Sequence, residues 1–300
     1  MHPATHSARD IALTGVSGST TLSDARITPA SRRARHARRA VNLARLSSLA
    51  AALSCTLPAM AQAPGGNGQP STTWSVGAGV ISAQKPYTDI SRDNKVLPLV
   101  QFENQYIEIF GPKIGLKLPS FNINASNQLN FNLVAKYDGS GYEAKDAAIL
   151  NGMRERKGGF WGGAEVEWKN DLADVKAAWL GDLSGNSKGQ QFSLGVERTW
   201  KVGGKLMLTP RAGAIWQDDK YVDYYFGVRD SEARVGRAAY TGKSGTTAEV
   251  GLRAIYMIDQ RHSLFADLAM SSLPKSIKNS SLVDSSTENR VMLGYTYRFQ

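Results

Sequence analysis

The chain has 300 residues, of which 42% are hydrophobic and 21% are charged, and its formal net charge is +10. This charge does not indicate nucleic-acid binding: residues 1–61 hold eight arginines and two acidic residues, while the remainder holds 28 basic and 24 acidic residues, interspersed. No segment approaches the roughly 18–20 consecutive apolar residues of a membrane-spanning helix. A membrane protein with this sequence would therefore be a closed β-barrel, the other structure that satisfies every backbone polar group internally.

Residues 1–61 are predicted to be an N-terminal extension followed by a cleavable signal peptide. Arginines between 32 and 45 form a positively charged region, residues 46–57 are largely apolar, and Ala59-Met60-Ala61 fits a small-x-small cleavage site. We predict cleavage between Ala61 and Gln62. Residues 1–31 make the leader unusually long, which is consistent with a translation start upstream of the native one.

Cleavage would remove Cys55, the one cysteine of the chain. A lipoprotein acylation site is disfavoured there, because Ala52 stands where a leucine is expected three residues upstream. The mature chain would then have neither disulfides nor cysteine-based metal sites. Residues 62–73 are rich in Gly, Pro, Ser and Thr and are predicted to be a flexible linker.

From residue 74 onward, apolar and polar residues alternate with a period of two, which is the spacing of a strand with one apolar face. The final run shows the pattern, with Val291, Leu293 and Tyr295 on one face. We predict an all-β fold over residues 74–300: a single antiparallel transmembrane β-barrel of about 12 strands. The predicted strands are 74–82, 95–103, 105–111, 113–118, 128–137, 160–169, 172–182, 190–201, 204–216, 246–258, 262–272 and 289–299.

The predicted connections alternate in length. Residues 170–171, 202–203 and 259–261 form tight polar turns, whereas residues 138–159 and 217–245 are long. An outer-membrane barrel has short periplasmic turns and longer extracellular loops, so this alternation supports the barrel. Residues 119–127, which join the fourth and fifth runs, are an exception on the short side.

Large aromatic residues stand near the ends of the runs, where amphipathic rings prefer the two membrane interfaces. The alternative is that they fill a soluble core. The last strand, with Gly294, Tyr297 and Phe299, fits the aromatic terminal strand that the barrel-assembly machinery recognises, although Gln300 follows the aromatic residue. The predicted interface aromatics are Trp74, Trp168, Trp200, Trp216 and Phe299.

Three short motifs resemble the MltA-interacting protein/OmpV family of outer-membrane proteins. They are Leu150-Asn151-Gly152-Met153 followed by Arg156, Tyr225-Phe226-Gly227-Val228 followed by Ser231 and Ala233, and the Tyr-x-Phe ending. The resemblance spans nearly all of residues 74–300. It implies an outer-membrane barrel and, for some members, a scaffold that joins a murein-cleaving lytic transglycosylase to a murein synthase. Other members are linked to adhesion or to osmotic responses.

A barrel phospholipase is one alternative function, since such an enzyme needs a histidine beside its serine nucleophile. The chain after residue 61 has one histidine, His262, which follows the predicted periplasmic turn 259–261. Chemistry on surface lipid would need it at the outer rim, so we interpret His262 as a solvated turn residue and expect no catalytic site. One histidine without cysteine does not form a usual zinc set, and we expect no metal or cofactor.

A narrow porin or small-solute channel is the second alternative. The predicted inner face carries charges of both signs, which can pair across the lumen, and about twelve strands leave a narrow interior. We therefore favour a largely filled barrel. The charged residues of this face are Glu165, Glu167, Lys169, Glu197, Arg211, Glu249, Arg253 and Asp267.

The segment 217–245 combines tyrosines with arginines, a composition that suits a contact surface. It fits a lid folded into the barrel mouth equally well, and both interpretations stay open. The candidate contact residues are Tyr221, Tyr224, Tyr225, Phe226, Gly227, Arg229 and Tyr240.

The leading functional hypothesis is a non-enzymatic scaffold of the cell envelope, exported to the outer membrane. Its expected partners are outer-membrane lipid, the barrel-assembly machinery and, by resemblance, a lytic transglycosylase and a murein synthase. Because the segment 217–245 is predicted to lie outside the cell, a murein enzyme would have to contact the periplasmic turns, residues 119–127 or the linker.

Overall fold

The computed structural model describes residues 72–90 and 92–299. The predicted leader, its cleavage site at Ala61 and Gln62, and nearly all of the linker lie outside these residues and remain predictions. No helix in the described part of the chain is long and apolar enough to cross a membrane. The strands are β1 (Thr73–Gln84), β2 (Arg92–Glu103), β3 (Ile107–Phe110), β4 (Lys113–Lys117), β5 (Phe121–Asn124), β6 (Asn127–Asp138), β7 (Gly159–Lys169), β8 (Asp174–Asp182), β9 (Gln190–Glu197), β10 (Trp200–Val202), β11 (Leu206–Gln217), β12 (Gly245–Met257), β13 (His262–Ser272) and β14 (Thr287–Phe299).

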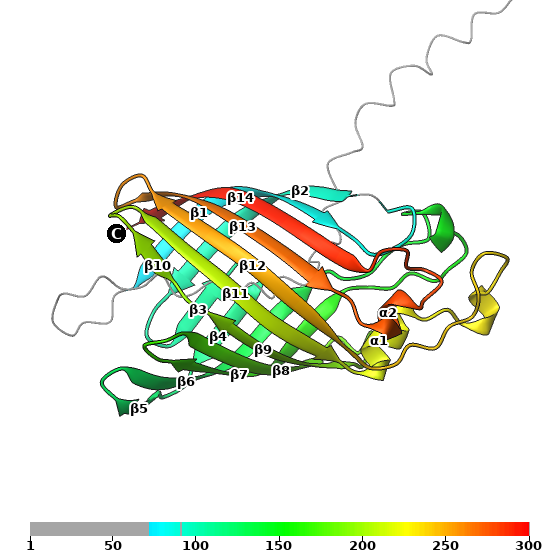
Figure 1. The fold of residues 1–300 in the computed structure, drawn as a ribbon, viewed down its shortest axis with the longest axis horizontal. Coiled ribbons are helices and arrows are strands. Elements are labelled where there is room, and N and C mark those ends of the chain that lie inside the picture. The colour runs from blue at the N-terminus through cyan, green and yellow to red at the C-terminus, as the bar shows by residue number, and fades with distance from the viewer. Residues whose placement is uncertain (1–71, 91, 300) are drawn as a thin grey trace, which may run out of the picture. The chain divides into compact units, whose positions relative to one another are not determined.

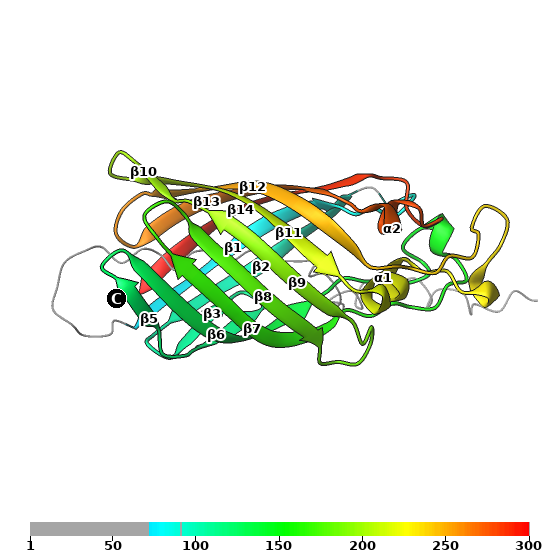
Figure 2. The same cartoon turned by 60° about the horizontal axis from the view of Figure 1, so that its bottom comes forward.

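These strands close into one antiparallel barrel, as predicted (Figures 1 and 2). β1 pairs with β14 from Trp74 opposite Phe299 to Ala83 opposite Arg290. Of the 14 strands in the described residues, β5 pairs only with β6, and β9 and β10 both pair with β11 as two parts of one wall strand. The barrel wall therefore has 12 strands.

The connection 119–127 differs from the prediction, because it contains strand β5 and forms a hairpin with β6. Asn124 makes the tight turn: its side chain accepts a hydrogen bond from the Ser126 N–H at 3.0 Å. Asparagine favours such turns because its short side chain mimics the backbone. The alternation of asparagine with apolar residues over 121–124 is too short to separate from a loop by periodicity alone.

The barrel has two different ends. The start of β1 lies beside the end of β14, so both termini of the barrel lie at the end that carries the short turns, which is the periplasmic end of an outer-membrane barrel. The long connections gather at the other end, where the helices α1 (Asp219–Phe226) and α2 (Lys275–Lys278) lie (Figure 1). Two 3-10 turns, Ala148–Leu150 and Asp230–Glu232, also belong to these connections.

Alternation along each strand sorts side chains between lipid and lumen. In β12, for example, Val250 is 57% exposed on the outer face, whereas the neighbouring inward position Arg253 is 1% exposed. Apolar residues face outward because membrane hydrocarbon has no hydrogen-bond partner for a polar group, and polar residues face the interior, where they find partners. The largest cluster of buried apolar residues lies mainly in the long connections at the outer end, and the inward residues Val134, Trp161 and Leu180 of the wall join it.

Candidate functional site

The outer mouth of the barrel is covered by what we call the outer lid, formed by residues 139–158, 218–244 and 273–286. Tyr87, in the connection between β1 and β2, stacks on Phe226 at a ring-centroid distance of 5.5 Å and donates a hydrogen bond to the Tyr225 carbonyl. The lid is thereby tied to the barrel mouth by aromatic packing. Its buried core includes Tyr142, Leu150, Met153, Tyr221, Val222, Tyr225, Phe226, Val228, Leu273, Ile277 and Leu282.

Helix α1 forms the centre of the lid because both of its ends are defined by the sequence. Asp218 caps the N-terminus, with its carboxylate accepting a hydrogen bond from the Tyr221 N–H at 2.9 Å. Gly227 ends the helix, and a Cβ there would lie 2.3 Å from the Asp223 carbonyl oxygen, so only glycine fits. Tyr221 and Tyr225, four residues apart, share the face that points into the barrel mouth.

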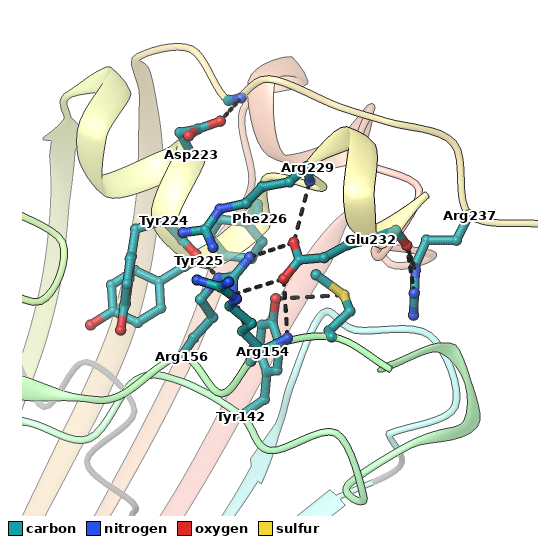
Figure 3. Close-up of polar contacts among 12 residues, drawn as sticks. Tyr142, Arg154, Arg156, Asp223, Tyr224, Tyr225, Phe226, Arg229, Glu232 and Arg237 are labelled. Atoms are coloured by element: carbon teal, nitrogen blue, oxygen red, sulfur yellow. Dashed lines mark hydrogen bonds and ion pairs between the residues drawn. The ribbon is translucent and has the colours of Figure 1, made fainter. Parts of the chain in front are cut away.

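Arg156 and Glu232 form a buried ion pair that joins two lid segments (Figure 3). Their side chains are 3% and 4% exposed, and Arg156 Nη2 lies 2.8 Å from Glu232 Oε2. The same carboxylate accepts a hydrogen bond from the Arg154 N–H at 3.0 Å, and Arg156 Nε donates to the Tyr224 carbonyl at 2.8 Å. A buried ion pair with its remaining groups hydrogen-bonded fixes one arrangement of the two segments.

Arg237 reinforces this junction through backbone carbonyl groups. Its Nε donates to the Glu232 carbonyl at 2.9 Å, and its Nη1 donates to the Asn151 carbonyl at 3.0 Å. Gly152, with a φ of +83°, allows the tight turn that presents the Asn151 carbonyl. The 3-10 turn that contains Glu232 is therefore held by two arginines, Arg237 close to it in the sequence and Arg156 from 76 residues away.

Glu232 is a strongly acidic group of the lid. Burial alone would raise the pKa of Glu232, but hydrogen bonds from Arg156 and from the N–H groups of Arg154 and Arg229 outweigh it and lower the pKa to about 2. Burial raises the pKa of Tyr221 and Tyr225, so both phenols stay neutral at physiological pH. The response of the lid to acid is therefore expected to come from Glu232.

The predicted contact residues lie on two sides of the lid. Tyr221, Tyr225 and Phe226 are 4%, 2% and 8% exposed and pack into the barrel mouth. The other four, with Lys220 and Asp223, line a cavity of about 520 Å³ on the outer side of the lid. These four are Tyr224, Gly227, Arg229 and Tyr240.

Beneath the lid, the inner face of the wall carries ion pairs between strands that are adjacent or one strand apart. Asp267 on β13 lies 2.8 Å from Arg211 Nη1 on β11 and 3.3 Å from Arg253 Nε on β12. Lys176 on β8 contacts both Glu167 and Glu197, each at 3.1 Å. The mixed charges predicted for the inner face therefore meet each other across the strands.

His262 lies at the start of β13, at the periplasmic end, where its Nδ1 is hydrogen-bonded to the Tyr295 hydroxyl. Its ring also meets Tyr297 edge-on, with the centroids 5.1 Å apart. Over residues 72–90 and 92–299, no group of three or more His, Cys, Asp or Glu side chains is arranged to hold a metal ion.

The predicted interface aromatics all lie on the outer face of the barrel, with exposed fractions between 40% for Trp216 and 54% for Trp200. Trp74 sits opposite Phe299 at the periplasmic end, and its ring contacts Phe102 at 4.6 Å. Trp216 lies near the outer end of β11. Two levels of exposed rings thus border the apolar band of the wall.

Together, the apolar outer wall, the paired charges of the lumen and the covered mouth define an outer-membrane β-barrel with a closed outer end. The model of the family described as MltA-interacting protein MipA matches residues 76–299. The chain belongs to this family, and it is an outer-membrane protein.

Named relatives agree with this membership. The chain is 26% identical to the putative outer membrane protein YiaT of Escherichia coli strain K12, over 75% of this chain and 90% of the relative. It is 25% identical to the MltA-interacting protein of the same strain with the same coverage, and 27% identical to the outer membrane protein OmpV of Vibrio cholerae, over 59% of this chain and 68% of OmpV.

Among solved structures, the NanC porin is similar with a TM-score of 0.39 and 9% identity, covering 75% of this chain and 98% of NanC. An outer membrane channel of Pseudomonas putida F1 is similar with a TM-score of 0.38 and 13% identity, covering 78% of this chain and 97% of the channel.

Proposed function

We propose that this protein is a non-enzymatic interaction protein of the outer membrane that holds murein enzymes at the envelope through its periplasmic hairpin. We call residues 118–128, which include β5, the periplasmic hairpin. The observation that carries the proposal is the exposure of apolar side chains on this hairpin, where a protein partner in the periplasm can reach them.

The turn of the periplasmic hairpin extends past the end of the barrel wall. Phe121 pairs with Leu129, which faces Trp168 of β7, and the β6–β7 pairing ends at Gln128. The hairpin turn therefore lies beyond the level of Trp168, at the end that carries the C-terminus (Figure 2). Phe121 is 62% exposed and Ile123 is 53% exposed. Exposed apolar side chains on a projecting strand are typical of a protein contact.

The far edge of β5 adds a second means of binding. Among the described residues β5 pairs only with β6, so its other edge presents free backbone N–H and C=O groups. A partner can add a strand to such an edge, with the backbone supplying affinity and alternate side chains supplying specificity. Phe121 and Ile123 would then provide the specific contacts.

The closed mouth and the paired lumen support a contact function over an open channel. A porin needs a continuous aqueous path, whereas here the lid core fills the mouth and Asp267 binds arginines of two neighbouring strands inside the barrel. The position of His262 at the periplasmic end, bonded to Tyr295, likewise supports a structural role for this histidine over phospholipid hydrolysis.

The partner class follows from the family. One relative is named an MltA-interacting protein, and the family resemblance implies a lytic transglycosylase and a murein synthase. These enzymes work on murein in the periplasm, which is the side that the hairpin faces. The outer lid lies at the opposite end and would not reach them.

The test is crosslinking in intact cells, followed by purification from the outer-membrane fraction and identification of the bound proteins. The double variant Phe121→Ser/Ile123→Ser is compared with Leu172→Ser, which changes a still more accessible leucine, 84% exposed, on the turn between β7 and β8. We expect the hairpin variant to lose a transglycosylase or murein synthase that the wild type and the Leu172 variant both retain. Recovery of the barrel alone from wild-type cells would overturn the proposal.

A further inference from the structure

One side of β2 lacks a strand neighbour over most of its length. β2 pairs with β1 along all of Arg92–Glu103, but it pairs with β3 only from Gln101 to Glu103. The reason is that β3 and β4 are short and turn back at Gly111, whose N–H donates to the Val100 carbonyl at 3.0 Å. Among the described residues, no strand pairs with this side of residues 92–99.

The unpaired edge lies at the depth of the membrane hydrocarbon. Trp74 and Phe102, whose rings are in contact, mark the periplasmic membrane interface below the edge. Arg92 marks the polar interface above the edge, where its Nε donates a hydrogen bond to Ser82 Oγ at 2.8 Å on the outer face. Val96 and Pro98 lie between these levels, opposite Val80 and Ala78 of β1.

A strand edge at this depth cannot simply face lipid, because hydrocarbon satisfies no backbone group; irregular backbone is found there only against protein or beside a cavity that admits water. Val100 directs its carbonyl towards β3, and alternate residues of a strand share that direction, so Val96 and Pro98 direct their backbone groups to the same side. Pro98 has no N–H, which removes one donor from the edge. The edge therefore fits the border of an opening in the wall.

Part of the inner face beside this edge is apolar, below the inward ion pair of Asp93 and Lys95 on the same strand. Ile81, Leu99 and Met292 form a buried cluster with Leu97 and Phe265 packed against it. The cluster lies over Gly79, where a Cβ would be 3.4 Å from both the Leu99 Cδ1 and the Met292 Cε atoms. Apolar side chains on the inner face of a barrel offer a surface to an apolar molecule, whereas paired charges do not.

The outer face of the same strands carries an apolar groove of about 550 Å³. Its floor includes Ala78, Ala254 and Ala266, and Val96 lies at its border, on the unpaired strand edge. In a membrane this groove lies against acyl chains, so the lipid beside β1 and β14 continues along the groove to the edge of β2.

We propose that the edge of β2 borders a lateral portal through which one acyl chain of a membrane lipid enters and lies against the apolar cluster of Ile81, Leu99 and Met292. The occupant is a lipid because the portal opens at hydrocarbon depth and because an apolar groove on the outside leads to an apolar cluster on the inside. This site is separate from the periplasmic hairpin, so either proposal can fail without the other.

The test places a photoreactive p-benzoylphenylalanine at single positions of the full chain, refolded in palmitoyl-oleoyl-phosphatidylcholine vesicles. Leu99 probes the inner cluster. Ala178, which faces the lumen on β8, is the matched inner control, and Val250, exposed on the outer face, is the positive control. We expect lipid adducts, identified by mass, at Leu99 in a yield near that of Val250 and several-fold above that of Ala178.

Two further positions keep the test decisive. Met292 replaces Leu99 if the first variant does not fold, as judged by its mobility shift on heating. A probe at Val96 asks whether a second copy of the chain covers the edge. A Leu99 yield equal to that of Ala178, or crosslinking of Val96 into a species of twice the chain mass without lipid adducts at Leu99, would overturn the proposal.

Discussion

At the residue scale, two buried carboxylates organise much of the arginine charge of this barrel. Asp267 is 3% exposed and accepts hydrogen bonds from both terminal nitrogens of Arg211, at 2.8 and 2.9 Å. Glu232 plays the corresponding part in the lid, where it pairs with Arg156. Each carboxylate offsets the free-energy cost of burying an arginine, and it does so only while the pair stays intact, because a lone buried charge is strongly unfavourable.

Asp267→Asn should therefore destabilise the barrel, by about 3–5 kcal/mol, since it leaves the arginines around it without their charge partner. The measurement is the free energy of unfolding in urea with the protein refolded in lipid vesicles. The matched control is Glu143→Gln, whose partner Lys145 is 62% exposed; an exposed pair contributes roughly 0–1 kcal/mol. Equal effects of the two variants would contradict the structural role of Asp267.

Acid should loosen the lid through Glu232. Its pKa is lowered from 4.5 to about 2 in the folded protein, so its contribution to stability is fully present above pH 4.5 and is lost as the pH falls towards 2. We expect cleavage of the lid by an acid-active protease such as pepsin to increase over this range. In Glu232→Gln, cleavage should be higher throughout and should lose most of this pH dependence; an unchanged pH profile would rule out Glu232 as the titrating group.

At the scale of elements, two short segments, α1 and the periplasmic hairpin, are stabilised in different ways. The hairpin is held by its pairing with β6 and by its own turn, which lies past the wall, whereas α1 has only eight residues and depends on its cap and on packing. Asp218 is 9% exposed and supplies the cap, so the local sequence fixes where the helix begins.

Asp218→Ala should weaken α1 by about 1 kcal/mol, because it removes the acceptor for the Tyr221 N–H. Amide hydrogen exchange would show faster exchange in residues 219–226 with unchanged protection in the barrel strands. Asp219→Ala serves as the control, since Asp219 is the first residue of the helix and not its cap. Equal acceleration in both variants would argue against the capping role.

At the scale of the whole molecule, the lid and the lumen together decide whether the barrel conducts. The lid closes one end and the ion pairs of Asp267 and Lys176 narrow the interior. We therefore expect this barrel, with its charged inner face, to offer no wide aqueous path.

We expect the wild type, reconstituted in planar bilayers, to show no steady single-channel conductance, because the outer lid covers the mouth and the charged side chains of the lumen are paired. Arg156→Ala should give brief, small openings, since it releases one junction of the lid but leaves the lumen pairs intact. Lys157→Ala is the control, because its side chain is 64% exposed and lies beside the junction. Steady, porin-like conductance of the wild type would favour the channel function over the scaffold.

The sequence by itself determined the barrel. Period-two alternation is a local property, because each residue faces lipid or lumen according to its place on its own strand. The runs and the parity of the connections therefore predicted the 12 wall strands and their orientation. The turn chemistry of Asn124 was also local, but the run beside it was too short to be distinguished as a strand.

Only the tertiary structure decided what the long connections do. Arg156 and Glu232 are 76 residues apart, and no local pattern indicates that they pair. The sequence motifs around Leu150 and Phe226 lie in segments of the lid, but only the tertiary structure shows that both segments contribute to one buried core. Among the described residues, the short β3–β4 hairpin likewise left one side of residues 92–99 of β2 without a paired strand, because pairing depends on the length of a neighbour as well as on the strand itself. Sequence alternation fixes the face of each side chain, whereas contacts between distant loops and edges follow from how the barrel closes.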